Sequence, residues 1–285
     1  MWCQPQARPE SRWFGAGPTA NVPTLMNENS ESAENTDTWD SIADWYVDLL
    51  RAGSALNDFN RDILLDQLPA DLTDQRVLDL GCGEGIITRA VAARGAAVLG
   101  IDPSPRMIEH ARSGGGVEPG SVAYSVDDAC VLATVADDSM HWVIAGLALN
   151  NVPDLDAALL AVRRVLRPAG SLVFTVPHPC FEAPQASWTH DSRAQAADGT
   201  ARRVVGDYLA EGFWRSTNPE AVRRAGNHHR TLTGYLRALL RHGYALEYAA
   251  EPSPTAAVAA QQPQRAGLPP FLMLRAAAAG SVESE

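Results

Sequence analysis

The chain has 285 residues, of which 46% are hydrophobic and 20% are charged. This composition is typical of a globular protein with a sizeable core, in one large domain or two small ones. The formal net charge of −11 argues against non-specific binding to nucleic acid, which needs clustered lysine and arginine. No apolar run is long enough for a membrane span, and the N-terminus lacks the pattern of a signal peptide. We therefore expect neither a nucleic-acid partner nor a membrane partner.

The cysteines argue against a metal centre. Cys3, Cys82, Cys130 and Cys180 form no C-x-x-C pair and no other zinc-binding spacing. We interpret them as reduced thiols and expect a cytoplasmic protein without a bound metal ion.

The N-terminal part of the chain changes character near residue 37. Residues 1–36 contain Gly, Pro, Asn, Ser and Glu without periodicity, so we expect a disordered tail. Apolar residues then recur at three- and four-residue steps over 37–50, which predicts an amphipathic helix. A second helix is predicted over 56–68, where Pro69 ends it.

Strand and helix patterns alternate from residue 76 to residue 176. Helical patterns predict helices over 85–94, 104–112 and 155–166. Strands separated by crossover helices indicate a parallel, doubly wound sheet with helices on both faces. The short apolar runs that predict these strands cover residues 77–80, 97–101, 122–126, 141–149 and 171–176.

The alternation stops at residue 177. Residues 177–230 hold several histidines and aromatic residues, and we expect an insertion that covers the C-terminal edge of the sheet. The predicted organisation is one domain over 37–276 followed by a short tail over 277–285. After the insertion the patterns predict a helix over 231–241, a strand over 244–251, a loop, and a final strand over 271–276.

The most informative motif is a glycine-rich turn between the first strand and the next helix. It reads DLGCGEG over residues 79–85. Glycines allow unusual backbone angles and let a ligand approach the main chain closely. The spacing is G-x-G-x-G and not the dinucleotide G-x-G-x-x-G, so a nicotinamide-dependent oxidoreductase is not favoured. Taken alone, the motif also fits a tight turn that binds no ligand.

Two acidic positions follow the second and third strands. Asp102 ends the second strand, where a carboxylate can accept hydrogen bonds from both hydroxyls of a ribose. The alternative is an aspartate that caps the helix after it. Asp128 and Ala129 follow the third strand, where an acid can bind an adenine amino group. The alternative there is a turn with solvated carboxylates.

Together these motifs resemble those of class I S-adenosylmethionine-dependent methyltransferases. The glycine turn matches the first motif of that family, and Asp102 matches its ribose-binding acid. The segment 165–170 resembles the family's "LRPGG" turn, with Ala169 in place of one glycine. The resemblance implies a Rossmann-like sheet of seven strands in the order 3-2-1-4-5-7-6, with the last strand antiparallel. It also implies S-adenosylmethionine as the cofactor.

The resemblance also implies which residues bind that cofactor. Tyr46 resembles a residue that closes over the cofactor carboxylate, and Met107 a residue that packs on adenine. For both, an ordinary core position is the alternative. The implied cofactor-binding residues are Tyr46, Asp79, Gly81, Gly83, Asp102, Met107, Asp128, Ala129 and Ala145.

The acceptor side is less well determined by the sequence. His178, between two prolines just after the fifth strand, is the candidate general base. The alternatives are a hydrogen-bonded loop histidine, or catalysis by positioning alone. Candidate acceptor-binding residues are Asn150, Tyr208 and His229.

The predicted function is methyl transfer to a nitrogen, oxygen or sulfur atom of a small molecule, a specialised metabolite by the resemblance to bacterial small-molecule enzymes. One alternative is an enzyme of the same fold that uses S-adenosylmethionine differently, for example by cyclising its aminobutyrate arm. Another is a non-catalytic cofactor-binding partner. The acceptor and the oligomeric state stay open.

Overall fold

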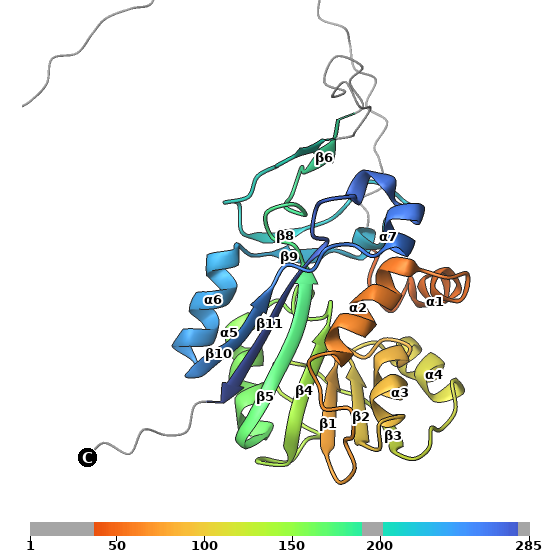
Figure 1. The fold of residues 1–285 in the computed structure, drawn as a ribbon, viewed down its shortest axis with the longest axis vertical. Coiled ribbons are helices and arrows are strands. Elements are labelled where there is room, and N and C mark those ends of the chain that lie inside the picture. The colour runs from red at the N-terminus through yellow and green to blue at the C-terminus, as the bar shows by residue number, and fades with distance from the viewer. Residues whose placement is uncertain (1–36, 190–201, 279–285) are drawn as a thin grey trace, which may run out of the picture. The chain divides into compact units, whose positions relative to one another are not determined.

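The computed structural model describes residues 37–189 and 202–278, which lie in one compact unit. The disordered tail expected over 1–36 lies outside these ranges. Of the C-terminal tail expected over 277–285, residues 277 and 278 instead belong to the last strand, and the rest lies outside the described ranges. The centre of the unit is a seven-stranded sheet with helices on both sides (Figure 1). Its strands are β1 (Arg76–Leu80), β2 (Ala97–Asp102), β3 (Ser121–Val126), β4 (Met140–Gly146), β5 (Leu166–Pro177), β10 (Tyr244–Ala250) and β11 (Phe271–Ala278).

The strand order is β10-β11-β5-β4-β1-β2-β3. The first five strands of the chain pair in parallel, whereas β11 runs antiparallel to both β5 and β10. Because β10 and β11 are the sixth and seventh strands of this sheet in the chain, the predicted order 3-2-1-4-5-7-6 is confirmed. The carboxyl ends of the parallel strands meet at one edge of the sheet, the upper edge in Figure 1.

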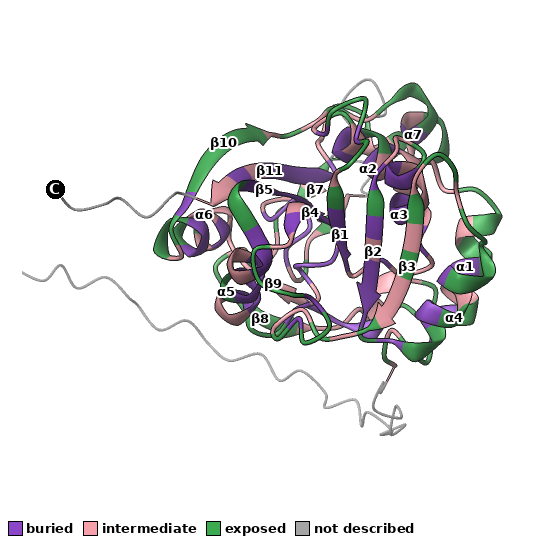
Figure 2. Cartoon of the chain, turned by 90° about the horizontal axis from the view of Figure 1, so that it is seen from below, coloured by how far each residue is buried: buried purple, intermediate pink, exposed green. Residues whose placement is uncertain are grey.

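Alternate residues of each strand pack on opposite faces of the sheet, as the two-residue period of a strand requires. Leu78 and Val143 belong to a core with α5 and α6, whereas Val77 and Ile144 belong to a core with α2 and α3. The middle strands are consequently buried, while the edge strand β10 is mostly exposed (Figure 2). The helices of the two faces are α2 (Ala55–Leu65), α3 (Ile86–Ala92), α5 (Leu155–Val165) and α6 (Leu232–Arg241).

The first helix is shorter than its sequence pattern suggests. α1 spans Ala43–Arg51, because residues 39–42 form a turn before it. Its buried residues Ala43 and Val47 pack against Met107 of α4 (Pro105–Ser113). α1 is therefore anchored to the helix that follows β2, and not to the sheet itself.

The segment after β5 forms a separate layer across the carboxyl edge, as Figure 1 shows. It contains two small two-stranded sheets, β6 with β7 and β8 with β9. Residues 190–201 of the expected insertion lie outside the described ranges. The elements of this layer are β6 (Ser187–Trp188), β7 (Arg203–Val204), β8 (Gly212–Trp214), the 3-10 helix η1 (Val222–Ala225) and β9 (Asn227–His229).

Two sequence-based expectations need correction. The loop predicted between the last two strands contains α7 (Ala256–Gln261) and the short η2 (Pro263–Arg265). The Thr255 side chain accepts a hydrogen bond from the Val258 N–H and so caps α7. In addition, the strand predicted to reach residue 149 ends at Gly146, where the chain leaves the sheet edge and turns.

Candidate cofactor and acceptor site

A cavity of about 510 Å³ lies at the carboxyl edge of the sheet. Its floor is the glycine turn after β1 together with the ends of β2 and β4. Residues of α1, α2, the inserted layer and the α7–η2 segment complete its walls. A ligand of small-molecule size would therefore contact segments from both halves of the chain.

The glycine turn adopts a conformation that only glycine tolerates easily. Gly81 and Gly83 have φ angles of 70° and 53°, in the left-handed region. A Cβ added to Gly81 would lie 2.5 Å from the Cβ of Ala148, so a larger residue cannot fit there. A Cβ at Gly83 would meet nothing within 4 Å, and Gly83 lines the cavity. The main chain at Gly83 is thus open to a ligand.

Asp102 lies at the end of β2, beside the glycine turn. Its carboxylate accepts hydrogen bonds from the N–H groups of Gly83, at 3.0 Å, and Ser104, at 2.9 Å. Burial raises the pKa of Asp102, and these two hydrogen bonds oppose that effect. Only 8% of the surface of Asp102 is exposed, yet this residue lines the cavity. The N-cap of the next helix is Ser104 and not Asp102, so Asp102 instead fixes the turn before that helix and has access to the cavity.

Asp79 lies beneath the turn rather than in the cavity wall. Its Oδ2 accepts a hydrogen bond from the Thr88 hydroxyl at 2.6 Å. Its Oδ1 is buried and has no partner among the described residues. Burial raises the pKa of Asp79 to about 7, against the hydrogen bond from Thr88. Asp79 therefore supports the turn from below.

The end of the cavity near β3 contains the predicted adenine-side residues. Asp128, Ala129 and Met107 all line the cavity. Asp128 is exposed, while Met107 is 2% exposed and also packs against α1. Ala145 does not line the cavity, because it is fully buried in the core on the α5 side. Its neighbour Gly146 takes that place in the wall.

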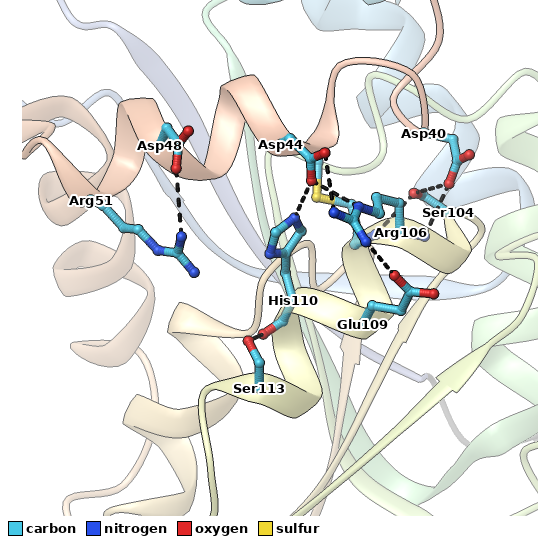
Figure 3. Close-up of polar contacts among 10 residues, drawn as sticks. Asp40, Asp44, Asp48, Arg51, Ser104, Arg106, Glu109, His110 and Ser113 are labelled. Atoms are coloured by element: carbon cyan, nitrogen blue, oxygen red, sulfur yellow. Dashed lines mark hydrogen bonds and ion pairs between the residues drawn. The ribbon is translucent and has the colours of Figure 1, made fainter.

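Polar contacts hold α1 over this end of the cavity (Figure 3). Asp40 accepts hydrogen bonds from the Ser104 hydroxyl, at 2.6 Å, and the Arg106 N–H, at 3.0 Å. Asp44 lies 2.8 Å from the Arg106 Nε and 2.6 Å from the His110 Nε2. The hydrogen bond from Arg106, and then that from His110, lowers the pKa of Asp44. α1 is thus fixed to the first turns of α4.

Tyr46 projects from α1 into the cavity wall. Its hydroxyl donates a hydrogen bond to the Asn57 Oδ1 at 3.2 Å, and its ring meets Trp39 edge-on at 5.4 Å between centroids. The pKa of Tyr46 is raised to about 12. Burial is the main cause, and repulsion from the negative charges of Glu84 and Asp102 adds to it. At neutral pH the hydroxyl is therefore a neutral donor.

The inserted layer is fixed to the sheet edge by main-chain contacts. Arg230 donates hydrogen bonds to the carbonyls of Leu149, Val152 and Pro153, at 3.0, 2.6 and 3.0 Å. The N–H of His228 donates to the carbonyl of Asn150 at 2.6 Å. These contacts hold β9 against the turn after β4, so the layer is bound to the edge where the cavity opens.

A buried carboxylate joins the inserted layer to the C-terminal segment. Glu182 lies 3.3 Å from Arg203, 2.8 Å from Arg223 and 2.6 Å from Arg265. Burial alone would raise the pKa of Glu182, but attraction to Arg223, Arg265 and Arg203 outweighs it and lowers the pKa. We call these four residues the arginine cluster. Glu182, Arg223 and Arg265 also line the cavity.

The structure does not bring the predicted acceptor-side residues together. Asn150 lines the cavity, but His178, Tyr208 and His229 do not. The His178 Nε2 lies 2.8 Å from a Glu251 carboxylate oxygen, and its Nδ1 accepts a hydrogen bond from the Cys180 N–H at 3.2 Å. Both ring nitrogens are thus engaged, and the side chain is 1% exposed. This geometry does not support His178 as a base.

Tyr208 and His229 contact each other instead of the cavity. The His229 Nε2 lies 2.7 Å from the Tyr208 carbonyl, and the Tyr208 hydroxyl accepts a hydrogen bond from the Leu232 N–H. Sequence reasoning missed other residues of the wall, because no local spacing connects them. They include Trp39, Asn57, Asn60, Glu182, Arg223, Asn227 and Arg265.

Over residues 37–189 and 202–278, no three histidine, cysteine or acidic residues gather as metal ligands would. Over the same ranges, no helix combines the length and apolar character that a bilayer span requires.

Sequence and structure comparisons agree with this geometry. A family model described as a methyltransferase domain matches residues 78–174. The chain is 32% identical to a ubiquinone biosynthesis O-methyltransferase of Xanthomonas oryzae, over 52% of this chain and 64% of that protein. It is 36% identical to a magnesium-protoporphyrin O-methyltransferase of Rhodobacter capsulatus, over 42% of this chain and 52% of that protein. The chain thus spans less than two thirds of the length of these two relatives.

A solved structure matches over more of the chain. The crystal structure of an S-adenosylmethionine-dependent methyltransferase from Mesorhizobium loti is 31% identical and superposes with a TM-score of 0.64. The match covers 79% of this chain and 99% of that one. The chain therefore belongs to the family of S-adenosylmethionine-dependent methyltransferases.

Proposed function

We propose that the protein transfers the methyl group of S-adenosylmethionine to a nucleophilic nitrogen, oxygen or sulfur atom of a small molecule. The observation that carries the proposal is a single cavity with two different ends. One end is the glycine turn with Asp102, and the other lies under the inserted layer and the α7–η2 segment. A cofactor and an acceptor can therefore meet within one cavity.

The residues of the first end fit the cofactor. Bound S-adenosylmethionine supplies a methyl group activated by a positively charged sulfur. Gly83 offers open main chain, and Asp102 and Asp128 offer carboxylates to a ligand that carries hydroxyls, amines and positive charge. The residues proposed to hold it directly are Tyr46, Gly81, Gly83, Asp102, Met107, Asp128 and Ala129, with Asp79 supporting the turn from below.

The chain's own contribution to the reaction is proposed to be positioning. Among the described residues, no histidine lines the cavity, so no histidine base is in place. Correct orientation of two reactants can lower a barrier by roughly 7–11 kcal/mol, and methyl transfer to a good nucleophile needs no base. α1 and the inserted layer hold the walls, exclude water and fix the direction of approach.

The small size of the acceptor is inferred from the cavity volume of about 510 Å³ and from the contacts between the inserted layer and the start of α1. Arg215 donates a hydrogen bond to the carbonyl of Asp37, and the Arg224 guanidinium lies 4.5 Å from the Trp45 ring centroid. The inserted layer therefore contacts the start of α1 across the cavity. A folded macromolecule would need an open groove instead. The relatives named as O-methyltransferases make oxygen the first atom to test.

Methyl-labelled S-adenosylmethionine provides the test of this function. The protein is incubated with it and a panel of phenols, amines and thiols, and products are identified by mass spectrometry. A labelled, methylated product that is absent with the Asp102→Ala variant supports the proposal. Release of methylthioadenosine without any methylated product would favour cyclisation of the aminobutyrate arm. Absence of any reaction and of S-adenosylhomocysteine binding would contradict both.

A His178→Gln variant tests whether positioning suffices. Because His178 bonds to Glu251 away from the cavity, we expect kcat to fall by less than about tenfold and the pH profile to keep its shape. A general base would contribute about 10²–10⁴-fold, and its loss would remove one limb of the profile. A loss of that size, with thermal stability unchanged, would restore His178 as the base.

A further inference from the structure

The cavity carries opposite charges at its two ends. Glu84, Asp102, Asp127 and Asp128 line the end at β1, β2 and β3. Over the described ranges, the arginines that line the cavity are Arg223 of η1 and Arg265 of η2, and no lysine does. In the sheet order, β5 and β11 lie on the other side of β1 from β2 and β3. Glu182 follows β5 and Arg265 precedes β11, so the arginine cluster is attached to that side of the sheet, while η1 also reaches α1 through Arg224 and Trp45.

The arginine cluster holds more positive charge than its carboxylate neutralises. Glu182 is, within the described residues, the one carboxylate at ion-pair distance from Arg203, Arg223 and Arg265. Three guanidinium groups around one carboxylate leave a net charge of two positive units at this wall. Glu182 is 6% exposed, so water screens the cluster weakly. Unbalanced charge in such a place favours binding of an anion.

At this end of the cavity, several hydrogen-bond donors also lack an acceptor within the described protein. Arg223 uses Nη1 for Glu182, and Arg265 uses Nε for Gln262 and Nη1 for Glu182. Their other guanidinium N–H groups have no protein acceptor over the described ranges. The Asn227 amide Nδ2 is buried without a partner there and lines the same cavity. Arginine forks and an amide donor are the groups that bind a carboxylate or a phosphate.

Apolar surface adjoins these donors. Pro270 and Phe271, from the start of β11, line the cavity, as does Leu56 of α2. An acceptor that fits this end therefore has an apolar body and an anionic head. The cofactor's own carboxylate is the competing occupant, and the test must separate the two.

We infer that the methyl acceptor carries an anionic oxygen group, a carboxylate or a phosphate, which Arg223, Arg265 and Asn227 bind. This inference rests on the proposed methyl transfer and names the class of its acceptor. Binding of the anionic head at η1 and η2 sets the acceptor's nucleophilic atom toward the glycine turn, because the cavity continues in that direction.

Calorimetry with matched probes tests the inference. The protein is first saturated with S-adenosylhomocysteine, and then titrated with benzoate, its neutral analogue benzamide, or phenyl phosphate. We expect the better of the two anions to bind about 10- to 100-fold more tightly than benzamide, the range for charge-assisted hydrogen bonds. Tighter binding of benzoate would identify the anionic group of the acceptor as a carboxylate, and tighter binding of phenyl phosphate would identify it as a phosphate. Benzamide binding as tightly as both anions, or no binding of either anion at millimolar concentrations, would overturn the inference.

Substitutions locate the site. Arg223→Gln and Arg265→Gln are each expected to lower the anion preference to about threefold or less, while S-adenosylhomocysteine affinity stays within about twofold. Arg241→Gln is the matched control, because Arg241 pairs with Asp156 on the exposed surface. It should leave both affinities unchanged. The preference for an anion over benzamide is measured on the unmodified protein. It therefore decides whether the cavity binds anions even if a variant does not fold.

Each remaining outcome points to one conclusion. Loss of S-adenosylhomocysteine affinity in both arginine variants would assign the cluster to the cofactor carboxylate and overturn the inference. If the preference for an anion over benzamide persists in both arginine variants, the inference is also overturned. Failure of S-adenosylhomocysteine to bind the unmodified protein would contradict the proposed function instead. The anion titrations of the free protein would then still decide whether the arginine cluster is an anion site.

Discussion

The two ends of the cavity are built in different ways. At the cofactor end, Gly81, Gly83 and Asp102 come from neighbouring strands joined by one helix, and a direct hydrogen bond links Gly83 to Asp102. At the acceptor end, Glu182, Arg223 and Arg265 come from three distant segments. One end follows from the sheet edge itself, whereas the other depends on long-range ion pairs. Changes at the two ends should therefore have separable effects.

The largest expected effect comes from Glu182→Ala. It leaves three arginines without their shared counter-ion, so we expect the free energy of unfolding to fall by about 3–5 kcal/mol. S-adenosylhomocysteine affinity of the folded fraction should change little. Urea unfolding and calorimetry measure the two quantities.

A matched control for Glu182 is Asp156, which also has two cationic partners, Arg241 and His242. Its side chain is 46% exposed, so Asp156→Ala should cost no more than about 1 kcal/mol. Equal losses in the two variants would remove the distinction between a buried cluster and a surface pair.

The second prediction concerns pH and the cofactor end. The pKa of Asp79 is about 7 in the fold, against a reference value of 3.8. Between these values the folded protein binds a proton that the unfolded chain has released, so this group makes stability fall as pH rises from about 4 to 7. Asp79→Asn should flatten that slope and raise stability at pH 8 by on the order of 1–4 kcal/mol.

Urea unfolding at several pH values measures this effect. Asp62→Asn, on the exposed face of α2, is the control and should keep the slope of the unmodified protein. A slope that is the same in the Asp79→Asn variant would show that Asp79 is ionised in the fold at neutral pH.

The third prediction separates the two functions of Asp102. Asp102→Ala should weaken S-adenosylhomocysteine binding by roughly 1.5–3 kcal/mol, or about 10- to 100-fold, through loss of charged hydrogen bonds. It should leave the anion preference of the acceptor end intact. Stability without ligand should fall by about 1–3 kcal/mol, because two main-chain N–H groups lose their acceptor. Unchanged affinity in a folded variant would leave Asp102 with only its hydrogen bonds to Gly83 and Ser104.

The smallest expected effect concerns α1. Asp44→Asn breaks the contacts with Arg106 and His110 shown in Figure 3, but Asp44 and Arg106 are exposed, so water and salt screen these contacts. We expect S-adenosylhomocysteine affinity to fall by about two- to threefold at low salt and to be unchanged at high salt. Asp48→Asn, on the same helix and facing Arg51, serves as the control without effect. An effect that is independent of salt would contradict an electrostatic attachment of α1.

Most residues that the sequence assigned to the cofactor lie in the cavity wall, because their signals are local. The glycine turn follows one strand, and Asp102 ends the next. When these parallel strands lie side by side, their carboxyl ends bring the turn and the acid together. The wall of the cavity contains Gly81, Gly83, Asp102, Asp128 and Ala129. Ala145 was misplaced, because a shift of one residue along a strand moves a side chain to the other face.

The sequence by itself determined most of the strands and helices and the composition of the glycine turn, since these depend on short-range pattern and backbone sterics. The strand order followed from the resemblance to a family and not from the residue pattern. Only the tertiary structure decided which polar residues of the inserted layer face the cavity. His178 resembled a base from its position after β5, yet its ring bonds to Glu251. Arg223 and Arg265 carried no local signal, because they meet Glu182 only after segments far apart in the chain have packed together. Ion pairs between distant segments depend on where the backbone places them, and no periodicity records that placement.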